Sequence, residues 1–542
     1  MTRASMVLVA TALASTCLAA RTFYVDVDGL GGRPSDDNPG TKTRPWQTPL
    51  KALAQAAPGD TVVFRGGTYR LPRTLHTSDF RAARHGRAPI ALKSHSGETA
   101  IITILRPISA AEWMPLADQG VQTVYRAQVS GGYRVSNVVE NGIPLRRARS
   151  QDPRNSLQDT PPESLTGAGQ WCASIRQRHV WVRTRDGHPP GDRVELCDVG
   201  GFGANGNLMY LQPHESGDWA ELHLVFERLV LETGFHGLLI RTGFVELRDC
   251  RLRKSFGDLL NSNSGRLVVE GCEFEQFGES AIDVTGPGPD AAADGPRATV
   301  IRNCDLHHSA QVRWPGQKGY NAVMLKGGCE DAVVEGCRFH DMLTTYGALT
   351  LGGASGGGKA GEGIGIIARN NIFRQVSGPY VVLFAASRDC SLVNNLFADN
   401  ASNALVHISR SKASDPTTHN VNPRIANNIL HANKLTDAPI RVPEGSAVGL
   451  VVDCNLLFDS GRICEYAGQA IPVAGEAVDW LRGNIIGQEP LFRAPEELDW
   501  RPVAGSPVID RGADIGRLAP ADMDGVARPQ GKGYDIGPFE WR

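Results

Sequence analysis

Three short segments in the middle of the chain carry a polar side chain within an alternating apolar pattern. They read SAIDVTG at 280–286, NAVMLKGG at 321–328 and GALTLGG at 347–353. Successive side chains of an extended strand point to opposite faces, so Asp283, Lys326 and Thr350 would share the outer face while their apolar neighbours point inward. Arg241, in GLLIRTG at 237–243, follows the same pattern. The pattern predicts an acid, an amine and a guanidinium on one face of a sheet.

Two loops beside these segments add further reactive groups. Segment 304–320 contains two histidines, an arginine and a lysine, and the loop before residue 347 contains a tyrosine. Long loops on a rigid scaffold often carry function. We therefore expect catalytic roles for Lys326, Asp283, His307, Arg313 and Tyr346, and substrate-binding roles for Arg241, His308, Lys318 and Thr350.

This mixture of groups suits β-elimination from a uronate-containing polysaccharide. A cation neutralises the uronate carboxylate so that the C5 proton can leave, a lysine or histidine removes that proton, and a tyrosine can protonate the leaving oxygen. The residue pattern by itself does not identify a cofactor. Ca²⁺ is the one that such an elimination can use, but no ligand set for it is recognisable in the sequence.

Two other functions fit the same residues. Hydrolysis of a glycosidic bond needs two carboxyl groups, for which Asp258, Glu279 and Asp283 are candidates. Retaining and inverting hydrolysis need carboxyl separations of about 5–5.5 and 6.5–9.5 Å, and both are available between neighbouring strands. The chain could also be a non-catalytic carbohydrate-binding or surface protein. In that case these charges are solvated surface groups.

A short repeat predicts the framework that positions these residues. Two or three β-forming residues precede a Cys or Asn, and an apolar residue follows two positions later, as in VELRDCRL at 245–252 and RIANNIL at 424–430. The marker residues are Cys250, Cys272, Cys304, Cys337, Asn371, Asn395, Asn428 and Asn455, at spacings of 22, 32, 33, 34, 24, 33 and 27. A minimum near 22 with irregular additions indicates a constant coil with loops of variable length. Stacked Asn amides would hydrogen-bond from coil to coil, and stacked Cys would fill core space.

These coils resemble those of right-handed parallel β-helix proteins, the pectate-lyase-like superfamily, over roughly residues 225–460. The resemblance implies an all-β, right-handed parallel β-helix solenoid whose outer sheet face, with Asp283 and Lys326, forms a substrate groove. The Lys326-Gly327-Gly328 segment is also similar to the lysine-bearing strand of alginate lyases and chondroitinase B. The resemblance favours a polysaccharide lyase ahead of a glycoside hydrolase.

The flanking segments complete the predicted organisation. Residues 48–57 read as a capping helix that ends at Pro58-Gly59, and 61–65 as the first strand. We expect a signal peptide at 1–20, an N-terminal cap with the first coils at 21–104, a β-rich insertion or irregular coils at 105–222, the β-helix core at 223–470 and a closing segment at 471–542. In the closing segment, Asp524, Asp535 and Glu540 are expected to be structural.

Composition and the N-terminus indicate the setting. The chain has 542 residues, 41% of them hydrophobic, and a net charge of −2, which disfavours a nucleic-acid partner. The stretch from Arg3 through Met6–Leu13 to Ala20 is typical of a signal peptide and too short to span a membrane. We therefore expect an exported protein with a polysaccharide substrate and a monomeric state. Cys172 with Cys197, and Cys454 with Cys464, are the more plausible disulfide pairs.

Overall fold

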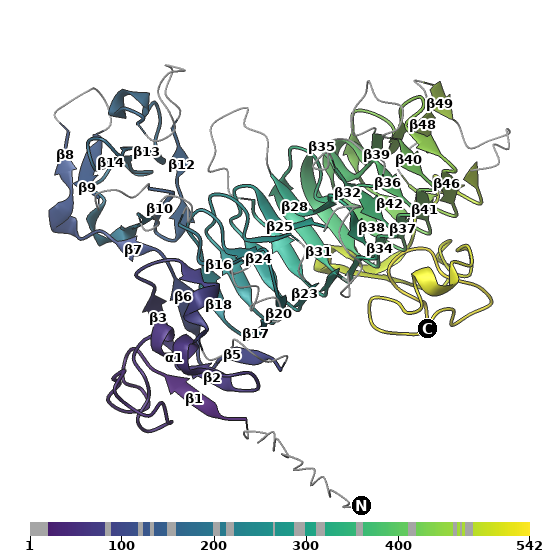
Figure 1. Cartoon of the computed structure of the whole chain (residues 1–542). Helices are drawn as coiled ribbons and strands as arrows, with labels where there is room; N and C mark the ends of the chain where they lie inside the picture. The colour runs from purple at the N-terminus through teal and green to yellow at the C-terminus, as the bar shows by residue number, and fades with distance from the viewer. Residues whose placement is uncertain are drawn as a thin grey trace, which may run out of the picture.

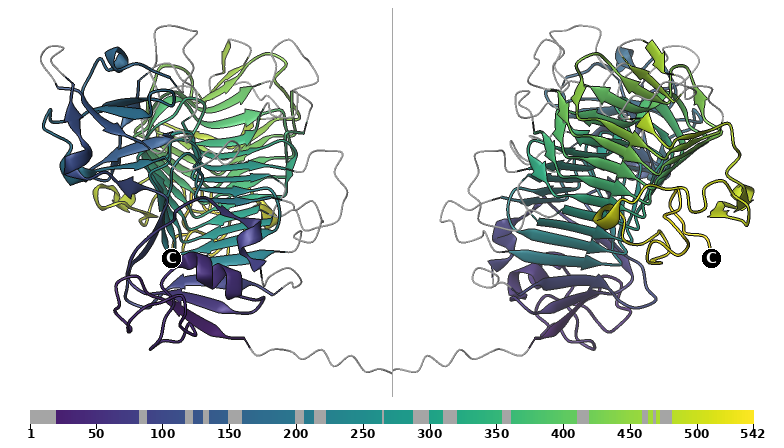
Figure 2. Two further views of the ribbon diagram at one scale, coloured as in Figure 1. Left: turned by 60° about the vertical axis from the view of Figure 1, so that its left-hand side comes forward. Right: turned by 90° about the vertical axis from the view of Figure 1, so that its right-hand side faces the viewer.

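The computed structural model shows a stack of parallel coils with three faces (Figure 1). It describes residues 20–81, 88–116, 123–129, 135–148, 159–198, 206–212, 222–263, 266–286, 299–309, 320–353, 361–409, 419–458, 463–466, 469–471 and 481–542. Figure 2 shows the strands of successive coils lying side by side along the stack. The predicted signal peptide, apart from Ala20, lies outside the described residues. No helix among the described residues is long and apolar enough to cross a membrane.

Each complete coil contributes to all three faces, and the strands of a face are parallel. Face 1 precedes the marker turn and consists of β1 (Thr22–Val25), β2 (Thr61–Phe64), β5 (Ile90–Ser94), β17 (His223–Glu227), β20 (Phe244–Arg248), β23 (Arg266–Glu270), β26 (Thr299–Arg302), β30 (Val333–Glu335), β34 (Ile367–Arg369), β37 (Ser391–Val393), β41 (Arg424–Ala426), β46 (Val451–Asp453) and β50 (Leu481–Arg482). Face 2 follows that turn and consists of β3 (Gly67–Arg70), β6 (Ala100–Thr103), β18 (Val230–Glu232), β21 (Arg251–Arg253), β24 (Glu273–Glu275), β27 (Asp305–His307), β31 (Arg338–Leu343), the start of β35 (Ile372–Ala385), β38 (Leu396–Ala398), β42 (Ile429–His431), β47 (Leu456–Leu457) and β51 (Ile485–Ile486).

Face 3 carries the predicted polar row. It consists of β4 (Leu75–His76), β16 (Met209–Leu211), β19 (Leu238–Ile240), β22 (Leu260–Asn263), β25 (Ser280–Thr285), β28 (Asn321–Lys326), β32 (Leu349–Gly352), the end of β35, β39 (Ala401–Ser409), β44 (Ile440–Val442) and β48 (Cys464–Tyr466). The register aligns Ile282 with Val323 and Leu349, all fully buried in the core. The predicted inward set is therefore confirmed. Five short strands, β29 (Cys329–Glu330), β33 (Gly363–Ile364), β36 (Ser387–Arg388), β40 (Asn420–Val421) and β45 (Ala447–Val448), bridge face 3 to face 1 in later coils.

The marker residues stack as predicted at the turn between faces 1 and 2. Asn395 N–H donates to Asn428 Oδ1 (2.9 Å), and Asn428 N–H donates to Asn455 Oδ1 (3.0 Å), so each amide caps the coil before it. The cysteines continue this pattern: Cys250 N–H donates to Cys272 Sγ (3.4 Å), and the Cys272 thiol donates to Glu270 O (3.3 Å). The stacked thiols therefore fill core space and also accept and donate hydrogen bonds.

Breaking this stack is expected to destabilise the coils. Asn428 accepts from the backbone and side chain of Asn395 and donates to Leu392 O and Asn455 Oδ1, and it is fully buried. Asn428→Ala leaves these buried groups without hydrogen-bond partners. It is expected to lower the free energy of unfolding, measured by chemical denaturation, by about 3 kcal/mol. Asn428→Cys is the matched variant because Cys272 accepts a backbone N–H at this position, so its cost should be smaller. Equal losses would mean that a thiol at this position does not replace the amide as an acceptor.

The first strand of the N-terminal segment 21–104 lies earlier in the chain than predicted. Helix α1 (Pro49–Gln55) has Thr48 as its N-cap, and the Thr48 hydroxyl accepts Lys51 N–H (3.3 Å). β2 (Thr61–Phe64) matches the predicted strand, but β1 (Thr22–Val25) precedes it and pairs with it in parallel. β1 is only four residues long and partly exposed, so its alternating pattern is too weak to predict a strand from the sequence alone. Ala52 and Leu53 of the helix are buried in the main core, so the helix covers the end of the stack.

The predicted β insertion forms two small sheets beside the stack (Figures 1 and 2). One contains β11 (Ile143–Pro144), β10 (Asn137–Glu140), β15 (Val194–Cys197) and β7 (Arg106–Pro107), and the other contains β12 (Arg146–Arg147), β13 (Gln170–Ser174), β14 (His179–Arg183), β9 (Tyr125–Gln128) and β8 (Met114–Pro115). All pairings in these sheets are antiparallel except that of β12 with β13. β16 already belongs to face 3, so the chain re-enters the coils before residue 222.

The closing segment lies along the turns of the later coils and includes a hairpin of β52 (Phe492–Ala494) and β53 (Asp499–Pro502). Asn394 Nδ2 donates to Asp535 O (2.9 Å), and Arg528 forms a fully buried ion pair with Glu540 (2.6 Å). Asp535 accepts Trp541 N–H (2.6 Å), and Asp524 pairs with Arg501 (2.8 Å). Asp524, Asp535 and Glu540 therefore hold this segment in place, as expected.

The disulfide expectation is wrong in the described structure. All ten described cysteines are free thiols, including Cys172, Cys197, Cys454 and Cys464. Cys172 lies in β13 and Cys197 in β15, which belong to the two different sheets of the insertion. Regular spacing of buried cysteines reflects stacking, and loop pairing cannot be read from it.

Candidate active site

Three successive coils place a titratable group immediately before face 3. The segments Phe235-His236-Gly237, Phe256-Gly257-Asp258 and Phe277-Gly278-Glu279 precede β19, β22 and β25. Ligand-capable atoms of His236, Asp258 and Glu279 all lie within 4.8 Å of one another. The coil repeat therefore brings one imidazole and two carboxyl groups to a single point, called here the acid cluster.

Asp258 is the deepest member of the acid cluster, with 2% of its surface exposed. Its Oδ1 accepts Ser280 N–H (2.9 Å), and its Oδ2 accepts the Asn261 amide (2.8 Å). Burial, followed by the nearby Asp283 carboxylate, raises the pKa of Asp258 to about 7, against the effect of these hydrogen bonds. Asp258 is thus a fixed carboxyl group that titrates near neutrality.

The orientation of His236 follows from one backbone contact. Asp258 N–H donates to His236 Nδ1 (2.8 Å), so a neutral His236 carries its proton on Nε2. Close approach of the ring requires a glycine, because a Cβ at Gly257 would lie 2.6 Å from the His236 ring. The Phe235 ring meets the His236 ring edge to face (4.5 Å) and stacks on Phe256 (5.7 Å). These contacts fix the imidazole against the next coil.

Two cations approach the cluster from face 3. Lys326 Nζ donates to Asp283 Oδ2 (2.7 Å), on neighbouring strands β28 and β25. Arg241 Nη1 donates to Asn261 Oδ1 (2.8 Å), and Asn261 in turn donates to Asp258. Asp283 Oδ1 is buried without a hydrogen-bond partner among the described residues. The cations thus tie Asp283 and Asn261 into one polar network around Asp258.

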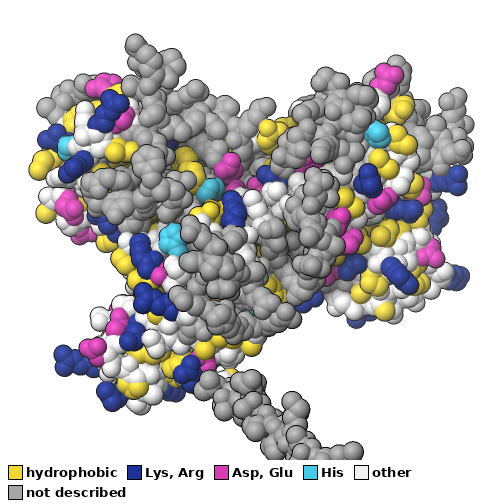
Figure 3. Space-filling model, in the orientation of Figure 1, with side chains coloured by type: hydrophobic (Ala, Val, Ile, Leu, Met, Phe, Trp, Pro, Cys, Tyr) yellow, Lys and Arg dark blue, Asp and Glu magenta, His cyan; other side chains and the backbone are white. Residues whose placement is uncertain are grey.

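The insertion packs against the coils that carry His236 and Asp258. Phe256, with Phe235 beside it, joins the hydrophobic cluster of the insertion, and Asn137 Nδ2 donates to Lys254 O (2.8 Å). The Arg147 guanidinium lies over the Trp171 ring at 4.9 Å and near the Phe256 ring at 5.9 Å. Figure 3 shows basic, acidic and histidine side chains gathered in a hollow between the insertion and the later coils.

The structure brings some of the residues predicted from sequence together and separates others. Asp283, Lys326 and Arg241 lie at the acid cluster. Thr350 is in the same outward row as Asp283, two strands further on, and its buried hydroxyl has no partner among the described residues. Tyr346 lies in the turn before β32 and is 38% exposed. Arg313 and Lys318 lie outside the described residues.

His307 and His308 do not join Lys326, contrary to the expectation from loop 304–320. His307 ends β27 on face 2, where it contacts Glu273 and His340. Lys326 ends β28 on face 3. Residues close in sequence here belong to different faces because the coil turns between them.

His236 is the member of the acid cluster that sequence reasoning missed. A signal was present: a Phe begins each of the three segments, and the titratable residues follow at spacings of 22 and 21. The coil spacing that the marker turn shows therefore recurs before face 3, where it aligns His236 with the two acids.

The acid cluster fits a Ca²⁺ cage poorly. Ca²⁺ takes six to eight oxygen ligands. Both Asp258 oxygens already accept N–H groups, Asn261 Oδ1 accepts Arg241, and Asp283 Oδ2 accepts Lys326. Few oxygens of the described residues therefore remain to surround a cation.

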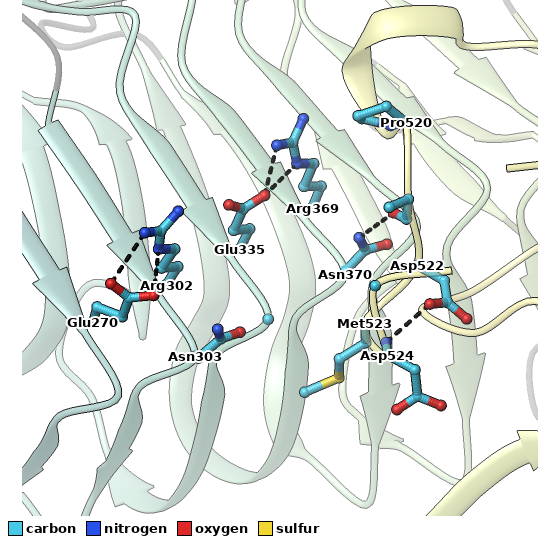
Figure 4. A pocket seen from close by; sticks show the side chains of 13 residues that line it. Glu270, Arg302, Asn303, Glu335, Arg369, Asn370, Pro520, Asp522, Met523 and Asp524 are labelled. Atoms are coloured by element: carbon cyan, nitrogen blue, oxygen red, sulfur yellow. Dashed lines mark hydrogen bonds and ion pairs between the residues drawn. The ribbon is translucent and has the colours of Figure 1, made fainter. Parts of the chain in front are cut away.

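A second concave region lies between face 1 and the closing segment (Figure 4). This cavity has a volume of about 450 Å³. Most charged side chains at this cavity are paired: Glu270 with Arg302 (2.9 Å), Glu335 with Arg369 (2.6 Å) and Asp524 with Arg501 (2.8 Å). Asp522 accepts the backbone N–H groups of Asp524, Val526 and Glu540. Because these acids already have partners, the cavity is a weaker candidate for catalysis than the acid cluster.

Comparisons with known proteins agree with this architecture. Residues 236–460 match the family described as a right handed beta helix region. Pectate lyase PEL9 of Emericella nidulans is 39% identical over 85 residues, which is 15% of this chain and 18% of that protein. The matched segment is thus less than a fifth of the length of that relative.

A solved structure shows the same fold over nearly the whole chain. The complex of XylC with xylose has a TM-score of 0.55 and 13% identity, covering 96% of this chain and 98% of that chain. Pectate lyase Pel9A has a TM-score of 0.43 and 11% identity, covering 97% of each chain. The stacked coils and the family match over residues 236–460 show that the chain has a right-handed parallel β-helix fold.

Proposed function

We propose that the protein is an exported glycoside hydrolase that cleaves with retention of anomeric configuration. The observation that carries the proposal is the approach of Asp258 and Glu279: one carboxylate oxygen of Asp258 lies within 4.8 Å of one carboxylate oxygen of Glu279. Retaining enzymes need carboxyl groups about 5–5.5 Å apart, whereas inverting enzymes need about 6.5–9.5 Å to admit a water. A polysaccharide or oligosaccharide is the expected substrate.

The surroundings of the two carboxyl groups assign their roles. Asp258 is held by Ser280 N–H and Asn261 and presents acceptor oxygens, which suits the nucleophile because attack on the anomeric carbon requires a fixed carboxylate. Glu279 is half-buried, so it can exchange a proton with solvent. Glu279 donates its proton to the leaving oxygen as the glycosidic C–O bond breaks, then takes a proton from the water that releases the sugar from Asp258.

The neighbouring groups bind and orient the sugar. The protonated Nε2 of a neutral His236 offers a donor, while the Lys326–Asp283 pair offers both donors and acceptors to adjacent hydroxyls. Arg241 acts through Asn261 to keep the Asp258 oxygens in place. The aromatic pair Phe235 and Phe256 backs the cluster with apolar surface.

The proposal is tested with the full chain and a panel of glycans. Because XylC was solved with xylose, aryl xylosides and xylo-oligosaccharides head the panel, followed by neutral and acidic polysaccharides. New reducing ends without the ultraviolet absorbance of an unsaturated uronate are expected. A product that carries this absorbance identifies elimination and overturns the proposal.

A lyase acting on a uronate polysaccharide is the second candidate, and the Lys326–Asp283 contact favours it. The amine lies on the outer row of face 3, beside a carboxylate and close to the Arg241–Asn261 pair. Lys326 would act as base after losing its proton and its contact with Asp283, and Arg241 would neutralise the substrate carboxylate. The poor fit for Ca²⁺ predicts that a chelator leaves the activity unchanged.

Lys326→Ala separates the two candidates. If Lys326 binds sugar in a hydrolase, the variant should raise KM about tenfold and leave kcat within a few-fold. A lyase that uses Lys326 as base should lose kcat by about 10²-fold or more. Steady-state kinetics on the same substrate measure both constants, and Lys326→Arg controls for loss of the charge.

A further inference from the structure

A second cluster of titratable residues lies on face 2, away from the acid cluster. His307 ends β27, and His308 follows it with a positive φ of 50°. His340, in the same register on β31, stacks on His307 with ring centroids 5.0 Å apart. His308 meets the His307 ring edge to face at 4.8 Å. Three imidazoles from two coils therefore share one small surface.

The protonation of His307 follows from its partners. His307 Nε2 lies 3.1 Å from Glu273 Oε1. A carboxylate accepts hydrogen bonds, so Nε2 carries the proton, and a neutral His307 has a bare lone pair on Nδ1. That atom faces His308 Nδ1 at 2.6 Å, shorter than the usual range for an N–H donor. Two ring nitrogens thus converge on one point.

The neighbouring coil shows how the same position looks when it is fully paired. His340 Nδ1 contacts Asp341 Oδ2 at 2.6 Å, and His340 Nε2 contacts Asp305 Oδ1 at 2.7 Å. Both ring N–H groups there have carboxylate acceptors, and the hydrogen bond to Asp305 is the larger cause of the raised pKa of His340. In the coil of His307, a second imidazole stands where His340 has Asp341.

We propose that His307 and His308 bind a transition-metal cation such as Zn²⁺, Ni²⁺ or Cu²⁺ through their Nδ1 atoms. A histidine ligand typically donates its other ring N–H to a carboxylate, as His307 does to Glu273. Imidazole nitrogens favour these metals over Ca²⁺ or Mg²⁺. Two metal–nitrogen bonds of about 2.0–2.1 Å require the nitrogens to separate to about 3.3 Å, which rotation of the exposed His308 side chain allows.

The nearby carboxylates orient the site and are not its ligands. Glu273 and Glu275 each come close enough to His307 to share a cation, but Arg251 already pairs with Glu275 (2.6 Å) and Glu273 (3.3 Å). Solvent completes the coordination of the metal. The bound ion would fix the end of β27 to the turn that follows it, so its role is structural.

Calorimetric titration of the metal-free full chain with Zn²⁺ tests the proposal. We expect the wild type to bind Zn²⁺ at this site. His308→Gln and His307→Gln should each lower the affinity for Zn²⁺ at least tenfold. Glu279→Gln is the control, because it alters the acid cluster and should leave this site unchanged. Equal Zn²⁺ binding by the wild type and His308→Gln, or loss only in Glu279→Gln, overturns the proposal.

Cu²⁺ electron paramagnetic resonance gives a readout independent of folding stability. Two equatorial ring nitrogens are expected in the wild type and one in His308→Gln. Because His308 is exposed, its replacement should not disturb the fold, and misfolding would not explain the lost nitrogen. Zn²⁺ should also raise the melting temperature of the wild type and not that of the variant. A spectrum with the same nitrogen count in both proteins would place the metal elsewhere and overturn the proposal.

Discussion

Asp258→Asn and Glu279→Gln are each expected to lower kcat/KM for glycoside hydrolysis by about 10³-fold or more. Each substitution keeps the shape of the side chain and removes one of the two carboxyl groups that the reaction needs. Because the groups act in one sequence of steps, the double variant should lose little more than either single variant. Initial rates on the best substrate of the panel measure the effect.

Azide separates the two roles. In Asp258→Asn, azide can attack the anomeric carbon directly, so a glycosyl azide of inverted configuration is expected. In Glu279→Gln, the glycosyl-enzyme on Asp258 still forms with a good leaving group, so the azide product should retain configuration. The opposite pair of products would exchange the assigned roles and leave the carboxylate pair itself intact.

The pH profile provides a second test of the roles. If Asp258 is the nucleophile, it must be ionised, and kcat/KM should rise as pH increases through its pKa of about 7. A fall through the same range would make Asp258 the proton donor.

Glu335→Gln, which removes a paired carboxylate on face 1, is the matched control for the two substitutions and should keep wild-type rates. Full activity in Asp258→Asn and Glu279→Gln would exclude hydrolysis by this pair.

The sequence predicts the framework well because the coil constrains a few positions strictly. The turn between faces 1 and 2 admits only residues such as Asn428 or Cys272, whose side chains satisfy the backbone of the preceding coil. The same periodicity sets which side chains point outward, so Asp283, Lys326 and Arg241 reach one site. The first strand, β1, was not predicted, because its partner β2 lies 39 residues later in the chain, with Thr22 opposite Thr61.

The site is predicted less completely because proximity depends on the face and not on distance along the chain. Asp258 and Glu279 were recognised as acids, but the sequence does not reveal that Gly257 lets the His236 ring rest on the next coil. His307 and Lys326 are 19 residues apart and lie on different faces, whereas His236 and Glu279 are 43 apart and touch the same point. Residue type predicted the chemistry, and coil position decides which groups meet.

The stability gained by Asp258→Asn is expected to grow as the pH rises. Burial and Asp283 raise the pKa of Asp258 from its usual 3.8 to about 7 in the folded protein. Between these values the folded chain binds a proton that the unfolded chain has lost, so the wild type loses folding free energy as pH increases from about 4 to about 7. A shift of about three units corresponds to about 4 kcal/mol at most. The amide variant has no such loss.

Chemical denaturation of both proteins between about pH 4 and pH 8 measures this effect. The difference in unfolding free energy, variant minus wild type, should increase with pH and level off above the folded-state pKa of about 7. The amide oxygen introduced by Asp258→Asn still accepts Ser280 N–H, but its NH2 group faces the Asn261 amide that donated to Asp258. This lost hydrogen bond adds a cost that does not depend on pH, so the change with pH reports the buried charge. Glu335→Gln removes an ion-paired carboxylate and should show no such increase.

A difference that is independent of pH would mean that Asp258 ionises normally in the fold. An increase would show that the acid cluster is maintained at the expense of stability, as expected for a residue kept for its chemistry.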